Sequence, residues 1–128
     1  MKIIKTEYAG INPYITKDSS IIRELMHPMV HGNEKQSLAE ATVPVGAKTL
    51  LHKHHKSEEI YYIVEGKGMM TISDNKFEVK KGDTICIPPG APHQIENINN
   101  IPLKILCCCS PPYSHEDTEL MELDEITK

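Results

Sequence analysis

The 128-residue chain contains no tryptophan, only one phenylalanine and a single arginine, Arg23. Its apolar runs fall well short of the about 20 residues that a membrane-spanning helix needs. Residues 1–5 lack the long apolar core of a signal peptide. The formal net charge is −4, so there is no excess of positive charge with which to bind nucleic acid or an anionic membrane. These absences favour a cytoplasmic protein without a membrane or nucleic-acid partner.

The four cysteines lack the spacing of a disulfide framework or a zinc site. Three are adjacent, Cys107–Cys109, and adjacent residues of a strand point to opposite faces. We interpret them, and Cys86 in a strand over residues 84–87, as small buried side chains that pack in the core. An alternative stays open for Cys107 and Cys109, which share one face: a thiol there could reach a cavity.

Short alternating segments, separated by proline and glycine, run through most of the chain. With 25% charged and 39% hydrophobic residues, the composition is that of one globular domain, residues 1–128. The turn Asp74-Asn75 predicts a hairpin, and Pro28 ends an earlier strand. The pattern predicts strands over residues 21–27, 37–43, 69–73, 76–80 and 101–109. About eight to ten short strands of this kind indicate an all-β sandwich or barrel.

The two ends of the chain read differently from the middle. Residues 1–20 show no sustained period and predict an extended arm. The acidic tail begins at His115, and residues 118–126 have the one helical period of the chain, so we expect a short helix there. His27 and His31 are interpreted as surface or structural residues.

Two histidines with a carboxylate after them mark the first segment of interest, residues 46–66. His52 and His54 are two positions apart, so on a strand they point the same way, with about 7 Å between their Cα atoms. Glu59 begins the next predicted strand and can offer an oxygen to the same point. His55 is expected to point outward, and Glu58 is a weaker substitute for Glu59.

A third histidine lies in the second segment, residues 82–97. A β-branched strand there runs into Pro88-Pro-Gly90, which cannot continue a ladder. The chain must reverse at this point, and His93 opens the return strand. Ile95 then shares the face of His93, just as Tyr61 shares the face of Glu59.

These two segments resemble the two signature motifs of the cupin superfamily. The first pattern, Gly-x5-His-x-His-x4-Glu-x6-Gly, is filled by Gly46, His52, His54, Glu59 and Gly66. The second pattern, Gly-x5-Pro-x-Gly-x2-His-x3-Asn, is filled by Gly82, Pro88, Gly90, His93 and Asn97. The resemblance implies a double-stranded β-helix, the jelly-roll barrel, with an N-terminal strand arm and a short C-terminal acidic tail or helix. It also implies a homodimer in which the N-terminal strand pairs with a second subunit.

Three imidazoles and one carboxylate form a donor set suited to one divalent metal ion, Mn, Fe, Ni, Co or Zn. We therefore expect His52, His54, Glu59 and His93 to bind such an ion and to leave positions open for a small-molecule substrate. The structural alternative is that these residues only shape the turns. Glycine and proline explain the turns, but three co-facial histidines are left unexplained.

The segment 110–117 carries Tyr113, His115, Glu116 and Asp117 directly after a strand. It could be a lid whose polar groups face the barrel mouth or a solvated exit, and we slightly favour the exit. Arg23 could anchor an anionic substrate if its strand reached the cavity, which we do not favour.

Function stays open between several classes, since cupins with this ligand set have many activities. We favour a metal-dependent enzyme on a small oxygenated metabolite, either a dioxygenase-type oxidoreductase or a sugar or sugar-phosphate isomerase. Tyr61 and His115 are the candidate catalytic residues, and His115 or Glu116 could supply the base that an isomerase needs. The alternative is a non-catalytic module that binds a sugar or organic acid. A weaker possibility is that the acidic tail docks a partner.

Overall fold

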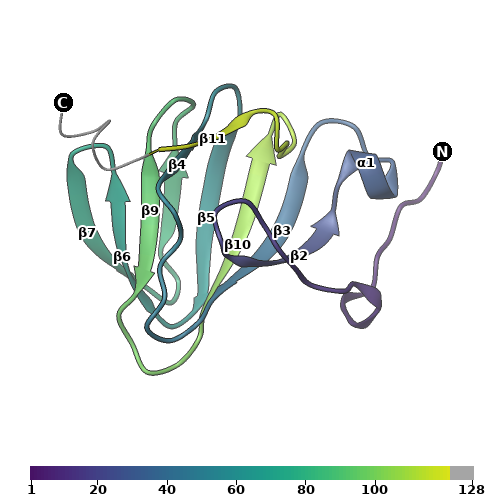
Figure 1. Cartoon of the computed structure of the whole chain (residues 1–128). Coiled ribbons are helices and arrows are strands. Elements are labelled where there is room, and N and C mark those ends of the chain that lie inside the picture. Colours follow the sequence, from purple (N-terminus) through teal and green to yellow (C-terminus); the bar gives the residue numbers. More distant parts are fainter. Residues whose placement is uncertain (122–128) are drawn as a thin grey trace.

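A computed structural model describes residues 1–121 and contains two facing antiparallel sheets (Figure 1). One sheet has the strand order β1-β2-β3-β10-β5-β8, and the other has the order β11-β4-β9-β6-β7. The strands of the first sheet are β1 Tyr14–Ile15, β2 Ile21–Met26, β3 Ser37–Val43, β10 Leu103–Ser110, β5 Glu58–Glu65 and β8 Thr84–Ile87. Those of the second are β11 Thr118–Leu120, β4 His52–His54, β9 His93–Asn97, β6 Lys67–Ile72 and β7 Asn75–Lys80. This arrangement confirms the expected all-β jelly-roll barrel.

Strand β10 shows how the alternating pattern builds the core. It pairs with β3 on one edge and with β5 on the other. Leu103, Ile105, Cys107 and Cys109 are buried, while the residues between them are only partly buried. The inward residues meet those of the facing sheet, because a strand presents alternate side chains to one face. The predicted late apolar strand is thus confirmed as the centre of the first sheet.

The facing sheet closes on this core through β6. Gly68 in that strand has no room for a side chain, since a Cβ there would lie 3.0 Å from atoms of Ile95 and Leu103. The two-residue loop of the β6–β7 hairpin is Ser73-Asp74, one position earlier than predicted. Ser73 adopts φ 51°, the left-handed region that tight hairpin turns use. The hairpin itself is confirmed.

Near the N-terminus, β2 is hydrogen-bonded within the chain along both edges, by β3 and by the short β1. A 3₁₀ turn, η1 Tyr8–Gly10, precedes them, and the single α-helical turn α1 Pro28–His31 follows β2. His27 caps that turn, because its Nδ1 accepts from the backbone N–H of Met29 at 3.0 Å. His27 is therefore structural, as expected, and the homodimer stays a prediction.

Two expectations from the sequence were wrong. The tail does not begin a helix at Thr118, because residues 118–120 form β11 and pair with β4; residues 122–126 of the predicted helix lie outside the described residues. Cys86 does not pack in the core but is exposed, since β8 turns Ile85 and Ile87 inward instead. Within residues 1–121, no helix has the length and apolar character to cross a membrane.

Candidate metal centre

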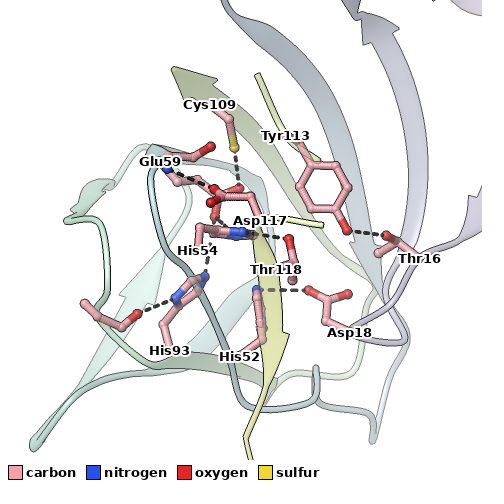
Figure 2. A network of polar contacts seen from close by, with 12 residues as sticks. Thr16, Asp18, His52, His54, Glu59, His93, Cys109, Tyr113, Asp117 and Thr118 are labelled. Atoms are coloured by element: carbon pink, nitrogen blue, oxygen red, sulfur yellow. Dashed lines mark hydrogen bonds and ion pairs between the residues drawn. The ribbon is translucent and has the colours of Figure 1, made fainter. Parts of the chain in front are cut away.

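The four expected ligands converge on one point between the sheets. His52 and His54 come from β4, Glu59 from the start of β5 and His93 from the start of β9. His52 pairs directly with His93 across the β4–β9 ladder, which brings the two histidine segments together. One ligating atom from each of the four residues lies within 4.8 Å of the other three (Figure 2). All four side chains are buried, with relative exposures of 5% or less.

Hydrogen bonds determine which ring nitrogen of each histidine faces the centre. The Nδ1 atoms of His52 and His93 lie 2.8 Å and 3.0 Å from the carbonyl oxygens of Leu50 and Ala91. A carbonyl oxygen can only accept, so Nδ1 carries the proton, and the Nε2 lone pair of each neutral ring faces the centre. These two imidazoles are set in the tautomer that binds a metal.

His54 reaches the same state through a side chain from the tail. Its Nδ1 lies 3.0 Å from Oγ1 of Thr118, and that hydroxyl donates a hydrogen bond to the carbonyl oxygen of Ser114. Thr118 Oγ1 therefore accepts from His54 Nδ1–H, which leaves the Nε2 lone pair of His54 free as well. The sequence carried no signal for this contact, because Thr118 is 64 residues from its partner.

Glu59 is the fourth residue of the group, and only one of its two carboxylate oxygens accepts a hydrogen bond. Its Oε2 accepts from the thiol of Cys109 at 3.3 Å. Its Oε1 lies 3.2 Å from Nε2 of His54 and 3.4 Å from Nε2 of His93. Burial tends to raise the pKa of Glu59, but the hydrogen bonds and charge that His54 and His93 can supply outweigh it and hold the pKa well below its usual range. Glu59 is thus a carboxylate.

These contacts fit a bound cation. Nε2 of His93 and Oε1 of Glu59 are buried without a hydrogen-bond partner among the described residues. A nitrogen lone pair and a carboxylate oxygen that face each other across 3.2–3.4 Å repel unless a positive charge lies between them. Burial and the neighbouring His93 lower the pKa of His52 to about 4, so the ring of His52 is a poor source of that charge. Three neutral imidazoles and one carboxylate suit a divalent metal.

The two neighbours in sequence point away from this centre, as expected. His55 is about half exposed, and its Nε2 lies 3.4 Å from Glu119 on the outer surface. Glu58 is exposed on the outer face of β5. Alternation along β4 and β5 therefore separates His54 from His55 and Glu59 from Glu58.

A cavity with about 600 Å³ of empty space, counting the part open to solvent, is lined by three of the four residues, His52, His54 and Glu59. Tyr61 and Ile95 line it, as their alternation predicted. Cys107 and Cys109 line it too, so both interpretations of these cysteines hold: they are buried in the core, as expected, and their face of β10 also reaches the cavity. The remaining lining residues are Tyr14, Thr16, Asp18, Ser20, Ile22, Glu24, Ala39, Ala41, Val43, Thr49, Ile105, Tyr113 and Thr118.

The tail covers part of this cavity, which corrects the preference for a solvated exit. The ring of Tyr113 lies 5.7 Å from that of His54, and its hydroxyl lies 3.1 Å from Oγ1 of Thr16 (Figure 2). His115, in contrast, is exposed and does not line the cavity. Its Nδ1 lies 3.1 Å from the Tyr113 hydroxyl, so it reaches the site only through that residue.

Asp18 is, like Thr118, a residue of the site that the sequence did not predict. Its Oδ2 lies 3.4 Å from Nε2 of His52, on the side where the ligating lone pairs meet (Figure 2). Its Oδ1 is occupied by the backbone N–H and the hydroxyl of Ser20, at 3.0 Å and 2.6 Å. Asp18 lies in the N-terminal segment, which has no periodic pattern, so nothing in the sequence links it to His52.

The family follows from a comparison with known proteins. The family model of the cupin domain matches residues 39–109, more than half of the chain. The chain belongs to the cupin family. The matched range contains all four residues of the metal centre, while Asp18, Tyr113 and Thr118 lie outside it. These three residues therefore belong to the parts of this cupin that the family model does not describe.

Three relatives show how far the similarity extends. A protein of Methanocaldococcus jannaschii without an assigned function is 74% identical over 122 residues, 95% of this cupin and 98% of its own length. An oxalate-binding protein of Thermotoga maritima is 34% identical over 84 residues, which are 66% of this cupin and 65% of that protein. The oxalate decarboxylase of Bacillus subtilis, in a structure concerned with its Mn(II) centres, has a TM-score of 0.76 at 24% identity, covering 89% of this cupin. This cupin spans only 31% of that decarboxylase, so the likeness shows the fold.

Proposed function

We propose that this cupin is a metal-dependent enzyme that moves a proton on a small oxygenated metabolite, as an isomerase or lyase does. The observation that carries the proposal is the position of Asp18 Oδ2, 3.4 Å from the ligating nitrogen of His52. His52, His54, Glu59 and His93 would hold one divalent ion there. Of the metals that suit this donor set, Mn(II) has the support of the structural relative with Mn(II) centres.

The bound ion would act as a Lewis acid that polarises an oxygen of the ligand and makes a neighbouring C–H or O–H more acidic. Asp18 is placed to accept that proton. The hydroxyl and N–H of Ser20 hold its Oδ1, so the carboxylate is oriented and Oδ2 is the oxygen that can take a proton. An isomerase needs a base beside the metal, and this residue provides one.

The phenol of Tyr61 remains neutral and helps to shape the space around the ligand. Burial raises the pKa of the Tyr61 phenol, and the negative charge of Glu59 raises it further. Tyr61 can therefore donate a hydrogen bond to a developing negative charge on a ligand. His115 is placed one residue further out, where it can orient the hydroxyl of Tyr113.

Exchange of substrate protons with solvent tests the proposed reaction. Hydroxycarbonyl compounds are incubated with the protein in D₂O, and NMR follows deuterium at the carbon next to the carbonyl. We expect incorporation with wild-type protein and a loss of about 100-fold with Asp18→Asn at unchanged metal content. Oxygen consumption that depends on the same compounds, without deuterium incorporation, would instead identify an oxidoreductase.

A second candidate is a binding module without turnover. The observation that favours it is the relative of Thermotoga maritima, which is named as an oxalate-binding protein. For such a module, a ligand would stabilise the protein against heat while neither deuterium nor oxygen is consumed. The same incubation therefore separates the two candidates.

A further inference from the structure

The polar side of the cavity is rich in hydrogen-bond acceptors and poor in positive charge. Three carboxyl groups line it, those of Asp18, Glu24 and Glu59. The lining residues include neither lysine nor arginine. A divalent ion at the metal centre carries two positive charges, so the three carboxylates in their ionised form leave an excess of negative charge.

The one arginine cannot supply the missing cation. Arg23 alternates with Ile22 and Glu24, which line the cavity, and therefore points to the other face of β2. Its guanidinium stacks on the ring of Tyr8, 4.4 Å from the centroid, and donates to the carbonyl oxygen of Ile11. Nε of Arg23 also lies 4.0 Å from Oε1 of Glu40. These contacts occupy Arg23 outside the site.

Lys17, which precedes Asp18 in the sequence, is also engaged in hydrogen bonds outside the cavity. The ammonium of Lys17 donates to the carbonyl oxygens of His115 and Thr118, at 3.2 Å and 2.7 Å. These bonds fasten the tail to the N-terminal segment, and Lys17 is not among the lining residues. An anionic ligand in the cavity would thus find no side-chain ammonium or guanidinium among the lining residues that the structure describes.

Glu24 offers an unused acceptor in the same cavity. Its Oε2 accepts from the hydroxyl of Tyr14 at 3.2 Å. Its Oε1 is buried and has no hydrogen-bond partner among the described residues. Burial raises the pKa of Glu24, which reflects how poorly the protein alone solvates this group. A buried acceptor of this kind is satisfied by a donor from outside the protein, such as a ligand hydroxyl.

We infer that the cavity selects a neutral polyhydroxyl ligand, one hydroxyl of which donates to Glu24, and that it disfavours small dicarboxylates. This inference rests on the proposed function, since the ligand would contact the metal centre with its other end. A dicarboxylate brings two more negative charges next to Asp18 and Glu24 and offers no donor to either. This cupin would therefore differ in ligand class from the relatives that are named for oxalate.

Competing neutral and anionic probes test the inference on the protein as purified. Calorimetry compares dihydroxyacetone and D-erythrose with oxalate and malonate, and metal content is measured on the same samples. We expect at least about 10-fold tighter binding of a neutral probe than of either dianion. Tighter binding of oxalate, or no binding of either neutral probe, would overturn the inference.

Two substitutions show whether Glu24 is the cause. In Glu24→Gln, which keeps the shape and removes the charge, we expect the preference for the neutral probe to fall about 10-fold, with oxalate binding improved. The matched control Glu58→Gln removes an exposed carboxylate of β5 and should leave the preference unchanged. If Glu24→Gln folds poorly, Glu24→Ala serves instead, and the wild-type comparison needs no variant.

The two proposals fail in distinguishable ways. Stoichiometric metal together with tighter oxalate binding would support the metal centre and contradict the proposed preference for a neutral polyhydroxyl ligand. Absence of metal together with a Glu24-dependent preference for the neutral probe would keep the ligand class and remove the proposed metal chemistry.

Discussion

Thr118 Oγ1 lies 3.0 Å from Nδ1 of His54 and donates a hydrogen bond to the carbonyl oxygen of Ser114. This contact joins the last described strand, β11, to the metal centre and sets the tautomer of His54. Replacement by valine keeps the shape and removes the hydroxyl. We expect Thr118→Val to weaken metal binding about 10- to 100-fold, measured by competition with a chromophoric chelator.

The control for this substitution keeps the hydroxyl. Thr118→Ser can still accept from His54 and donate to Ser114, so its metal affinity should stay near that of the wild type. Equal affinities for the valine and serine variants and the wild type would show that His54 finds its tautomer without help from the tail.

The four-ligand assignment is tested by two histidines on opposite faces. His93→Ala removes a ligand whose side chain is fully buried, and we expect most of the bound metal to be lost while circular dichroism still reports a β-rich fold. His55→Ala removes a half-exposed ring that contacts Glu119 outside the cavity. Its metal content, measured by elemental analysis, should equal that of the wild type. Unchanged metal in the first variant, or lost metal in the second, would mean that the wrong face has been assigned.

Metal removal should destabilise the fold, because the metal-free protein buries two polar atoms of the candidate metal centre without a hydrogen-bond partner among the described residues. These atoms are Oε1 of Glu59 and Nε2 of His93. A metal present at about 100 times its Kd stabilises the folded state by about 2.7 kcal/mol, which for a domain of this size corresponds to roughly 10 °C in Tm. A chelator should remove that increment in a thermal melt. The His93→Ala variant is the control, since it should melt at the same temperature with and without chelator.

The candidate metal centre could be predicted from sequence because its four residues lie in regular strands. His52 and His54 share a face through a period of two, and β4 and β9 pair so that His93 joins them. The spacing of glycine and proline in the two motifs sets the turns between those strands. Local patterns of this kind survive folding because each strand has one buried face.

The rest of the cavity depends on contacts between segments that have no regular pattern. Asp18 precedes β2 in a polar stretch, and Tyr113 and Thr118 follow a strand at the far end of the chain. Only the tertiary structure brings these residues beside His52 and His54, by bonds such as those of Lys17 to the tail. The prediction that Cys86 is buried was wrong because alternation alone does not tell which face of a strand is the buried one. Only the pairing of β8 with β5 decides this.

The same alternation makes the cysteines chemically distinct. Cys86 is exposed, whereas Cys107 and Cys109 are buried in the cavity wall. Burial, together with the charge of Glu59, raises the pKa of both buried thiols above the ordinary value, so at pH 8 they remain protonated and poorly nucleophilic. Brief treatment of the folded protein with iodoacetamide should therefore label Cys86 and spare Cys107 and Cys109, as read by peptide mass spectrometry. Labelling in denaturant, where all four thiols react, is the control. Rapid modification of Cys109 in the folded protein would show that the cavity wall opens to reagents and that Glu59 loses its thiol partner in solution.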